Sequence, residues 1–296
     1  MELWLLYAIG AAVFAALTTV LAKVGIKNVD SHLATAIRTI VVLIFAWMMV
    51  FVVGSHDGIR YIQGRTWVFL ILSGLATGGS WLCFFRALQL GDVNKVVPID
   101  KSSTIVTMIL AFIFLSEPVG WVTAVGMVLM GIGTWMMLEL KKKDNNEESK
   151  EETADNRSWL IYALLAAVFA SLIAIFGRIG VADIDANLWT AIRTMVVVPL
   201  SWLMVFIVGS HKSIKSVSRK SWIFLVLSGV ATGVSWLFFY HALQVGNASH
   251  VVPIDKLSIV LTMGFARLFL SESFSRRSVV GLGLLVVGTL LPIFVD

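Results

Sequence analysis

The stretch Val96-Val97-Pro98-Ile99-Asp100-Lys101 reveals how this sequence is organised, because it occurs twice without change. The second copy, Val251-Val252-Pro253-Ile254-Asp255-Lys256, begins 155 residues further along the chain. A constant offset aligns the two halves without a gap, and roughly half of the aligned positions are identical, so the chain is an internal duplication. The same offset joins further identical pairs, among them Arg38 with Arg193, His56 with His211, Trp81 with Trp236 and Glu117 with Glu272.

Composition places the chain in a lipid bilayer. Of its residues, 58% are hydrophobic and 14% are charged, and the mean hydropathy is +0.89. A water-soluble core cannot use that many apolar residues, so we expect an integral membrane protein. The net charge of +5 does not indicate nucleic-acid binding, because the basic residues are scattered and form no soluble patch for a phosphate backbone. Cys83 is the only cysteine, so we expect neither a disulfide framework nor a thiolate metal site.

Apolar runs long enough to cross a bilayer, about 20 residues each, recur along both halves. We expect α-helices, because a segment exposed to lipid must satisfy its own backbone hydrogen bonds, and barrel strands would be shorter and alternating. The ten predicted spans are residues 3–23, 33–53, 67–89, 96–115 and 119–139, and their repeats at 158–178, 188–208, 222–244, 251–270 and 276–294.

The predicted fold class is therefore an all-α membrane protein with ten transmembrane helices in two repeats. Because five is an odd number, homologous five-span units joined by a short linker must insert in opposite orientations. This predicts two inverted five-helix repeats, residues 1–139 and 158–296, an arrangement typical of secondary transporters. Residues 140–157 between them carry both charge signs without apolar periodicity, so we expect a solvated linker.

The distribution of basic residues predicts the orientation. Lysine and arginine collect in cytoplasmic segments, which places the linker in the cytoplasm and both termini outside. We expect the chain to be a multi-pass protein of the cell (inner) membrane. The side opposite the linker carries Arg60, Arg65 and Arg178. The linker side carries Lys23, Lys27, Lys95, Lys141, Lys142, Lys143, Lys150, Arg157, Lys212, Lys215, Arg219, Lys220, Arg276 and Arg277.

Several motifs recur in the same order in the two halves. Both halves carry Pro-Ile-Asp-Lys and a closing Phe-Leu-Ser-Glu. Each also has a first-span basic residue (Lys23, Arg178), a Thr-Ala-Ile-Arg segment (ending at Arg38, Arg193) and a Ser-Gly-x-Ala-Thr-Gly-x-Ser-Trp segment (ending at Trp81, Trp236). With this order the chain resembles the drug/metabolite transporter superfamily, in its ten-span branch built from two EamA-type domains.

The resemblance covers the whole chain except the linker. It implies a carrier of small metabolites, amino acids or drugs through a central cavity between the halves, and it does not imply a particular substrate. Ten-span members of this family are generally thought to keep both termini inside the cell. The charge distribution of this chain places them outside, and we follow that distribution.

The repeated Pro-Ile-Asp-Lys segment allows two interpretations. Proline suits the first turn of a helix, and an aspartate just after it favours the positive end of the helix dipole, so the segment could simply start spans four and nine. Alternatively, Asp100 with Lys101 and Asp255 with Lys256 bind substrate or a coupling proton, since ionisable groups in membranes are costly and often functional. Both roles are compatible, and we take these four residues as candidate coupling or gating groups.

Arg38 and Arg193 open spans two and seven, eight residues after Asp30 and Asp185. One interpretation is an arginine that snorkels to the interface, paired with that aspartate. The other is a cation that faces the cavity and binds an anionic group. We include both arginines among the candidate substrate-binding residues.

Trp81 and Trp236 lie in the middle of spans three and eight, where an interfacial aromatic belt is an unlikely role. Each follows a Gly-x-x-x-Gly motif, which lets helices approach closely. We predict that the two rings face each other's half across the central cavity, the alternative being core filler. The hydroxyl side chains near them, also candidates for substrate binding, are those of Thr77, Ser80, Thr232 and Ser235.

The leading functional hypothesis is a secondary transporter that moves a small organic solute across the membrane by alternating access. The alternative is a component of a lipid-linked-sugar flippase, or another non-transport membrane subunit. The sequence contains neither a Gly-rich phosphate loop nor a catalytic or metal-binding constellation, so we expect no enzyme, no cofactor and no metal. Expected partners are a small-molecule substrate and the lipid bilayer, but no nucleic acid. We expect a monomer, with a homodimer as the alternative.

Overall fold

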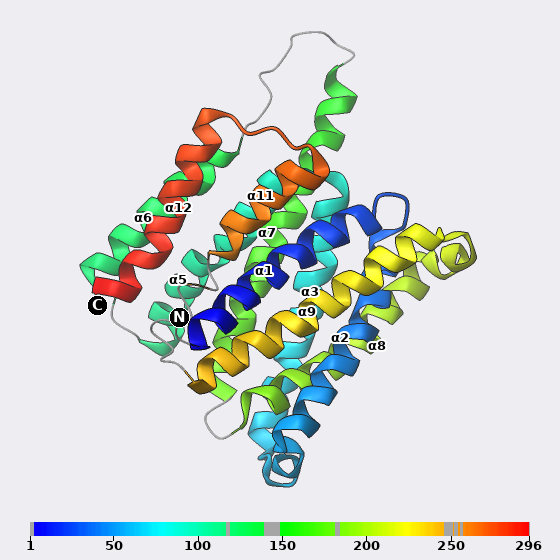
Figure 1. Ribbon diagram of the computed structural model, residues 1–296, viewed down its shortest axis with the longest axis vertical. Coiled ribbons are helices and arrows are strands. Elements are labelled where there is room, and N and C mark those ends of the chain that lie inside the picture. The colour runs from blue at the N-terminus through cyan, green and yellow to red at the C-terminus, as the bar shows by residue number, and fades with distance from the viewer. Residues whose placement is uncertain are drawn as a thin grey trace.

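The protein is a bundle of long helices (Figure 1). The structure, a computed structural model, describes residues 3–116, 119–138, 149–180, 184–245, 251, 254 and 257–295. In this part of the chain every element is helical and no strand occurs. The first half contains α1 (Leu3–Gly25), α2 (Ser31–Val53), η1 (Ser55–Tyr61), α3 (Gly64–Leu90), α4 (Val93–Lys101), α5 (Ser103–Leu115) and α6 (Trp121–Met137). The second half contains α7 (Ser149–Gly180), α8 (Ala186–Val208), η2 (Ser210–Ser216), α9 (Arg219–Val245), α11 (Ser258–Leu270) and α12 (Arg276–Val295).

Seven helical stretches among the described residues are long and apolar enough to cross a membrane. One of them, Val93–Leu115, combines α4 and α5, and two further apolar helices, α6 and α11, are shorter. The protein is therefore a multi-pass helical membrane protein, as predicted. The count of ten spans and their inverted arrangement stay predictions.

Helices of one half pack mainly against helices of the other. The most extensive contacts join α1 to α9, α3 to α7, α6 to α12 and α2 to α8. In Figure 1 the α6–α12 pair lies at one edge of the bundle and the α2–α8 pair at the opposite edge, with α1, α3, α7 and α9 between them. The two ends of the chain lie at the same end of the bundle (Figure 1). The middle of the bundle is thus built from the first and third long helices of each half.

Equivalent positions in the two halves have equivalent local structure. Asp30 and Asp185 each accept two backbone N–H bonds at the start of α2 and α8, which satisfies donors that a helix start leaves unpaired. Gly54 and Gly209 end the same two helices with φ of 77° and 81°, a left-handed conformation that glycine adopts without strain. The duplication seen in the sequence therefore extends to helix boundaries.

The Gly-x-x-x-Gly motifs bring helices of opposite halves close together, as predicted. A Cβ atom at Gly74 on α3 would lie 2.5 Å from the Cβ of Val196 on α8. The equivalent atom at Gly229 on α9 would lie 2.8 Å from the Cβ of Val41 on α2. Only glycine permits these approaches, and the contacts are reciprocal between the halves.

One expected boundary was wrong. Span four does not start at the Pro-Ile-Asp-Lys segment, because α4 begins at Val93 and Pro98 lies inside it. The segment instead ends α4, and Ser102, a turn residue with φ of −67° and ψ of −9°, separates it from α5. Leu257 has nearly the same backbone angles before α11. At the linker, α7 begins at Ser149, and its membrane-spanning stretch, Ser158–Gly177, agrees with the predicted span 158–178.

Candidate functional site

A cavity of about 330 Å³ lies between the two halves at the centre of the bundle. It is large enough for a small organic molecule, since ligand pockets usually start near 300 Å³. Its walls come from α1, α2, α3 and α4 of the first half and from α7 and α9 of the second. The lining residues are Ala15, Thr18, Thr19, Arg38, Ser80, Trp81, Phe84, Phe85, Asp100, Lys101, Ala170, Ile173, Thr232, Ser235 and Trp236.

Trp81 of α3 and Trp236 of α9 meet at this cavity. Their ring centroids are 6.4 Å apart and the ring planes are inclined by 36°. Each half thus contributes one ring to a shared aromatic wall. Such a wall suits apolar and cationic groups, because ring faces offer both contact area and a negative quadrupole.

Arg38 of α2 also lines the cavity, although only 2% of it is exposed. Its Nε donates to Oγ of Ser228 at 2.9 Å, and its Nη2 donates to Oγ1 of Thr232 at 3.0 Å. Its guanidinium carbon lies 4.1 Å from the ring centroid of Phe85. The interpretation of Arg38 as a snorkelling residue paired with Asp30 was wrong, because the arginine is buried and the aspartate caps α2 instead.

The hydroxyl groups near the tryptophans mainly tie helices together. Ser80 donates to the carbonyl oxygen of Ala166 at 3.1 Å, and Ser235 donates to that of Ala11 at 2.9 Å. Both contacts cross between the halves, and both hydroxyls line the cavity. Thr77 is buried, donates to the carbonyl of Ser73 within its own helix, and is not a lining residue.

Asp100 and Lys101 reach the cavity from the end of α4. A turn at Ser102 follows directly after them. The hydroxyl of Ser102 donates to the carbonyl of Ile99 at 2.6 Å, and the Ser102 N–H bonds back to carbonyls of the last turn. A charged pair is thereby placed inside the bundle at its solute-sized cavity.

The remaining predicted residues are elsewhere or outside the described residues. Arg193 is half-buried on α8 and does not line this cavity. Asp255 and Lys256, the second copy of the charged pair, lie outside the described residues. The cavity therefore brings together eight of the predicted residues, namely Arg38, Ser80, Trp81, Asp100, Lys101, Thr232, Ser235 and Trp236.

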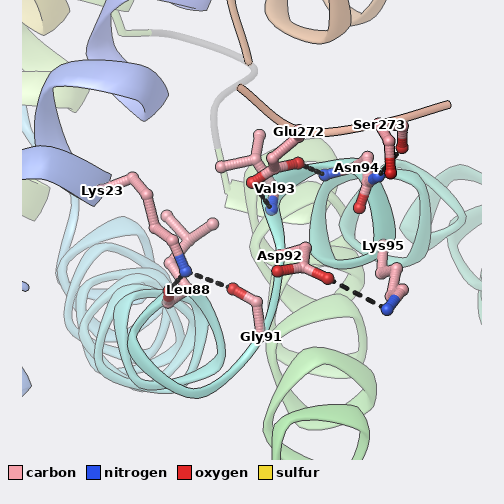
Figure 2. Close-up of polar contacts among 9 residues, drawn as sticks. All are labelled: Lys23, Leu88, Gly91, Asp92, Val93, Asn94, Lys95, Glu272 and Ser273. Carbon is pink, nitrogen blue, oxygen red and sulfur yellow. Dashed lines mark hydrogen bonds and ion pairs between the residues drawn. The ribbon is translucent and has the colours of Figure 1, made fainter. Parts of the chain in front are cut away.

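A second polar cluster joins the halves at the linker side of the bundle (Figure 2). Glu272 lies between α11 and α12, and its two carboxylate oxygens accept the backbone N–H groups of Val93 and Asn94 at 2.8 and 2.9 Å. These donors start α4, where the helix dipole favours a negative charge. The side chain of Asn94 in turn donates to the carbonyl of Ser273 at 3.1 Å. A loop of the second half thus caps the start of α4 in the first half.

Lys23 approaches the same cluster from α1 (Figure 2). Its Nζ donates to the carbonyl oxygens of Leu88 and Gly91 at the end of α3. Burial raises the pKa of the Glu272 carboxyl, as does the charge of Asp92, and these effects exceed the opposing effect of the backbone N–H groups and of Lys23. A vestibule of about 500 Å³ borders the cluster and also exposes Lys27 and Lys220.

Sequence reasoning overlooked several of these residues. Thr18 and Thr19 form a polar pair within an apolar span, a signal that could have marked them as lining residues. Phe85 offered no such signal, because its role depends on Arg38 of another helix. Glu272 was recognised only as part of a motif, since the helix start that it caps lies 179 residues earlier in the chain.

The fold and the cavity define a helical membrane protein with a candidate solute site between its halves. The sequence profile of the EamA-like transporter family matches residues 2–139 and 157–294, so the chain belongs to that family. The repeat of the profile agrees with the duplication.

Two relatives match less than half of this chain but nearly all of their own length. An uncharacterized transporter in the cobO 3′ region of Sinorhizobium sp. is 43% identical over 136 residues, which are 46% of this chain and 96% of the relative. An uncharacterized protein of Methanocaldococcus jannaschii is 26% identical over 132 residues, which are 45% of this chain and 93% of the relative. One solved crystal structure superimposes with a TM-score of 0.67 at 16% sequence identity, over 96% of this chain and 95% of the chain in that structure. At this identity the similarity shows the fold alone.

Proposed function

We propose that the protein is a secondary transporter that moves a small organic solute by alternating access through the central cavity. The observation that carries this proposal is the cavity itself, about 330 Å³ in volume and lined by aromatic, hydroxyl and charged side chains of both halves. A site shared between repeats is what a transporter needs, because movement of one repeat against the other can expose it to either face. The shared tryptophan wall favours a solute carrier over a lipid-linked-sugar flippase component.

The reciprocal contacts support two inverted five-helix repeats and, with them, ten spans. The capping aspartates, the glycine contacts and the turns at Ser102 and Leu257 all recur at the 155-residue offset. With the linker in the cytoplasm, both termini are outside a cell membrane. The protein works as a monomer in this proposal, because the complete cavity is formed within one chain.

The linker-side cluster is the contact that must break for the cavity to open toward the linker. Glu272 ties the second half to the start of α4, and α4 ends in the charged pair at the cavity. Release of Glu272 would therefore free the helix that carries Asp100 and Lys101. The duplication assigns the counterpart at the opposite end to Glu117 and Arg178. Glu117 and the Arg178 side chain lie outside the described residues.

The concentration dependence of solute flux tests this function. Purified protein in proteoliposomes should take up its solute with a rate that saturates, because each transport cycle starts from a bound state. A rate that rises linearly with solute concentration would indicate a channel. Protein-free liposomes give the background.

A further inference from the structure

We propose that the central cavity binds the carboxylate group of a monoanionic organic solute through Nη1 of Arg38. This assignment rests on the proposed function, since it takes the cavity as the solute site. Arg38 lines the cavity and is almost completely buried. Within the described part of the chain, its Nη1 has no hydrogen-bond partner and almost no accessible surface, while Nε and Nη2 are engaged. Nη1 therefore has an unsatisfied donor capacity, and a solute in the cavity reaches it by displacing the side chains that cover it.

The partners of Arg38 are all neutral. They are two hydroxyl groups and an aromatic ring, and no ion pair with Arg38 occurs in the part of the chain that the structure describes. A buried charge is costly unless it is paired, and guanidinium forks bind carboxylates with strong, directional hydrogen bonds. The missing counter-charge is therefore best supplied by the transported molecule.

The hydroxyl partners fix the orientation of the guanidinium group. Ser228 Oγ accepts from Nε and donates to the carbonyl of Thr18 at 2.6 Å. Thr232 Oγ1 accepts from Nη2 and lies 3.0 Å from the carbonyl of Ser228, to which it donates. Each hydroxyl thus has its proton committed to a backbone carbonyl and presents a lone pair to the arginine. The free Nη1 is held in place before any solute arrives.

The charges of the lining residues indicate a single negative charge on the solute. Arg38 and Lys101 are positive and Asp100 is negative, so the described lining residues leave one positive charge uncompensated. One carboxylate matches this balance, whereas a doubly charged phosphate does not. The body of the solute would contact Trp81 and Trp236.

Thermal unfolding of the purified full-length protein tests the assignment with matched ligands. Benzoate, hexanoate and 3-phenylpropionate are each compared with the corresponding amide, which has the same shape without the charge. We expect at least one acid to raise the melting temperature by about 3 °C or more at ten times its dissociation constant, and its amide to have little effect. No preference for any acid over its amide, or an equal effect of inorganic phosphate, would overturn the proposal.

Two arginine variants locate the site. Arg38→Met should weaken binding of the acid by about 10- to 100-fold, the usual effect of losing a hydrogen bond to a charged group. Arg65→Met is the matched control, because Arg65 also lies over a phenylalanine ring but is exposed at the start of α3. Unchanged binding in Arg38→Met would overturn the proposal. If Arg38→Met does not fold, Arg38→Lys takes its place. We expect Arg38→Lys to fold and to bind the acid about tenfold more weakly than the parent protein. Full affinity in Arg38→Lys would also overturn the proposal.

The carboxylate site and the transport function can be refuted independently of each other. Saturable flux of neutral solutes that carboxylates do not inhibit would overturn the carboxylate site and leave transport intact. Binding of the acid at Arg38 without flux of any solute would leave the site intact and overturn transport.

Discussion

Replacement of Glu272 by alanine should open the linker side of the bundle. The carboxylate accepts the N–H groups of Val93 and Asn94 at 2.8 and 2.9 Å, and alanine leaves both without this partner. Hydrogen bonds to a charged group contribute about 1.5–3 kcal/mol each, but removal of a half-buried charge offsets part of that loss. We expect a net shift of about 1–2 kcal/mol toward the linker-side-open state, a factor of about 5–30 in the equilibrium.

Cysteine accessibility measures this shift. Ala15 lines the cavity, so Ala15→Cys in a Cys83→Ala background provides one reactive thiol inside it. An impermeant thiol reagent applied from the linker side should label the Glu272→Ala variant about 5–30 times faster than its parent. Asp57→Ala, which removes an exposed carboxylate elsewhere, should not change the rate. An unchanged rate in the Glu272 variant would refute a gating role for this cluster.

The same residue predicts a pH dependence. Burial raises the pKa of the Glu272 carboxyl in the closed arrangement above that of a solvated carboxyl, so the closed state binds the proton more tightly. Protonation of Glu272 therefore stabilises the closed state as the pH falls through the raised pKa. This stabilisation is complete below the ordinary pKa of a solvated carboxyl. Labelling from the linker side should therefore slow more steeply on acidification in the parent than in a variant without the Glu272 carboxyl, beyond the loss of thiolate that all variants share. In Glu272→Gln, which is neutral at every pH, only the general loss of thiolate should slow labelling. An equally steep slowing in that variant would assign the additional response to another group.

Three further predictions follow from the packing, the charged pair and the topology. Gly229→Ala should lower stability by about 1–3 kcal/mol in thermal unfolding, because the added Cβ would lie 2.8 Å from a side chain of α2, whereas Gly264→Ala has open space and should be neutral. Asp100→Asn and Asp255→Asn should reduce solute flux more than membrane insertion, and normal flux in both would limit these aspartates to a structural role. A protease should cut within residues 140–157 from the cytoplasmic face, and cleavage from the outer face alone would reverse the topology.

The sequence predicts most of the helices because each long apolar run must be helical in lipid. It also predicts the meeting of Trp81 and Trp236 in space, because the duplication makes the two positions equivalent. The start of α4 was misplaced, since proline favours a helix start but Pro98 lies inside α4. Local pattern alone could not place that boundary, because Glu272 of the other half caps the start of α4.

Arg38 illustrates the limit of sequence reasoning for the site. The sequence places it near the start of a span, where snorkelling and anion binding are both reasonable. The choice depends on Ser228, Thr232 and Phe85, which come from two other helices and surround the guanidinium group. Burial is a property of the packed bundle, so no motif around Arg38 itself could have revealed it.

Counterflow in proteoliposomes is the most direct test of carriage through the central cavity. Vesicles loaded with unlabelled solute should transiently accumulate labelled solute, because a carrier returns with whichever molecule it has bound. The double variant Trp81→Ala/Trp236→Ala, which removes the shared aromatic wall, should lose this accumulation while its melting temperature stays close to that of the parent. Absence of counterflow for every solute that stabilises the protein, or full counterflow in the double variant, would contradict transport through this cavity.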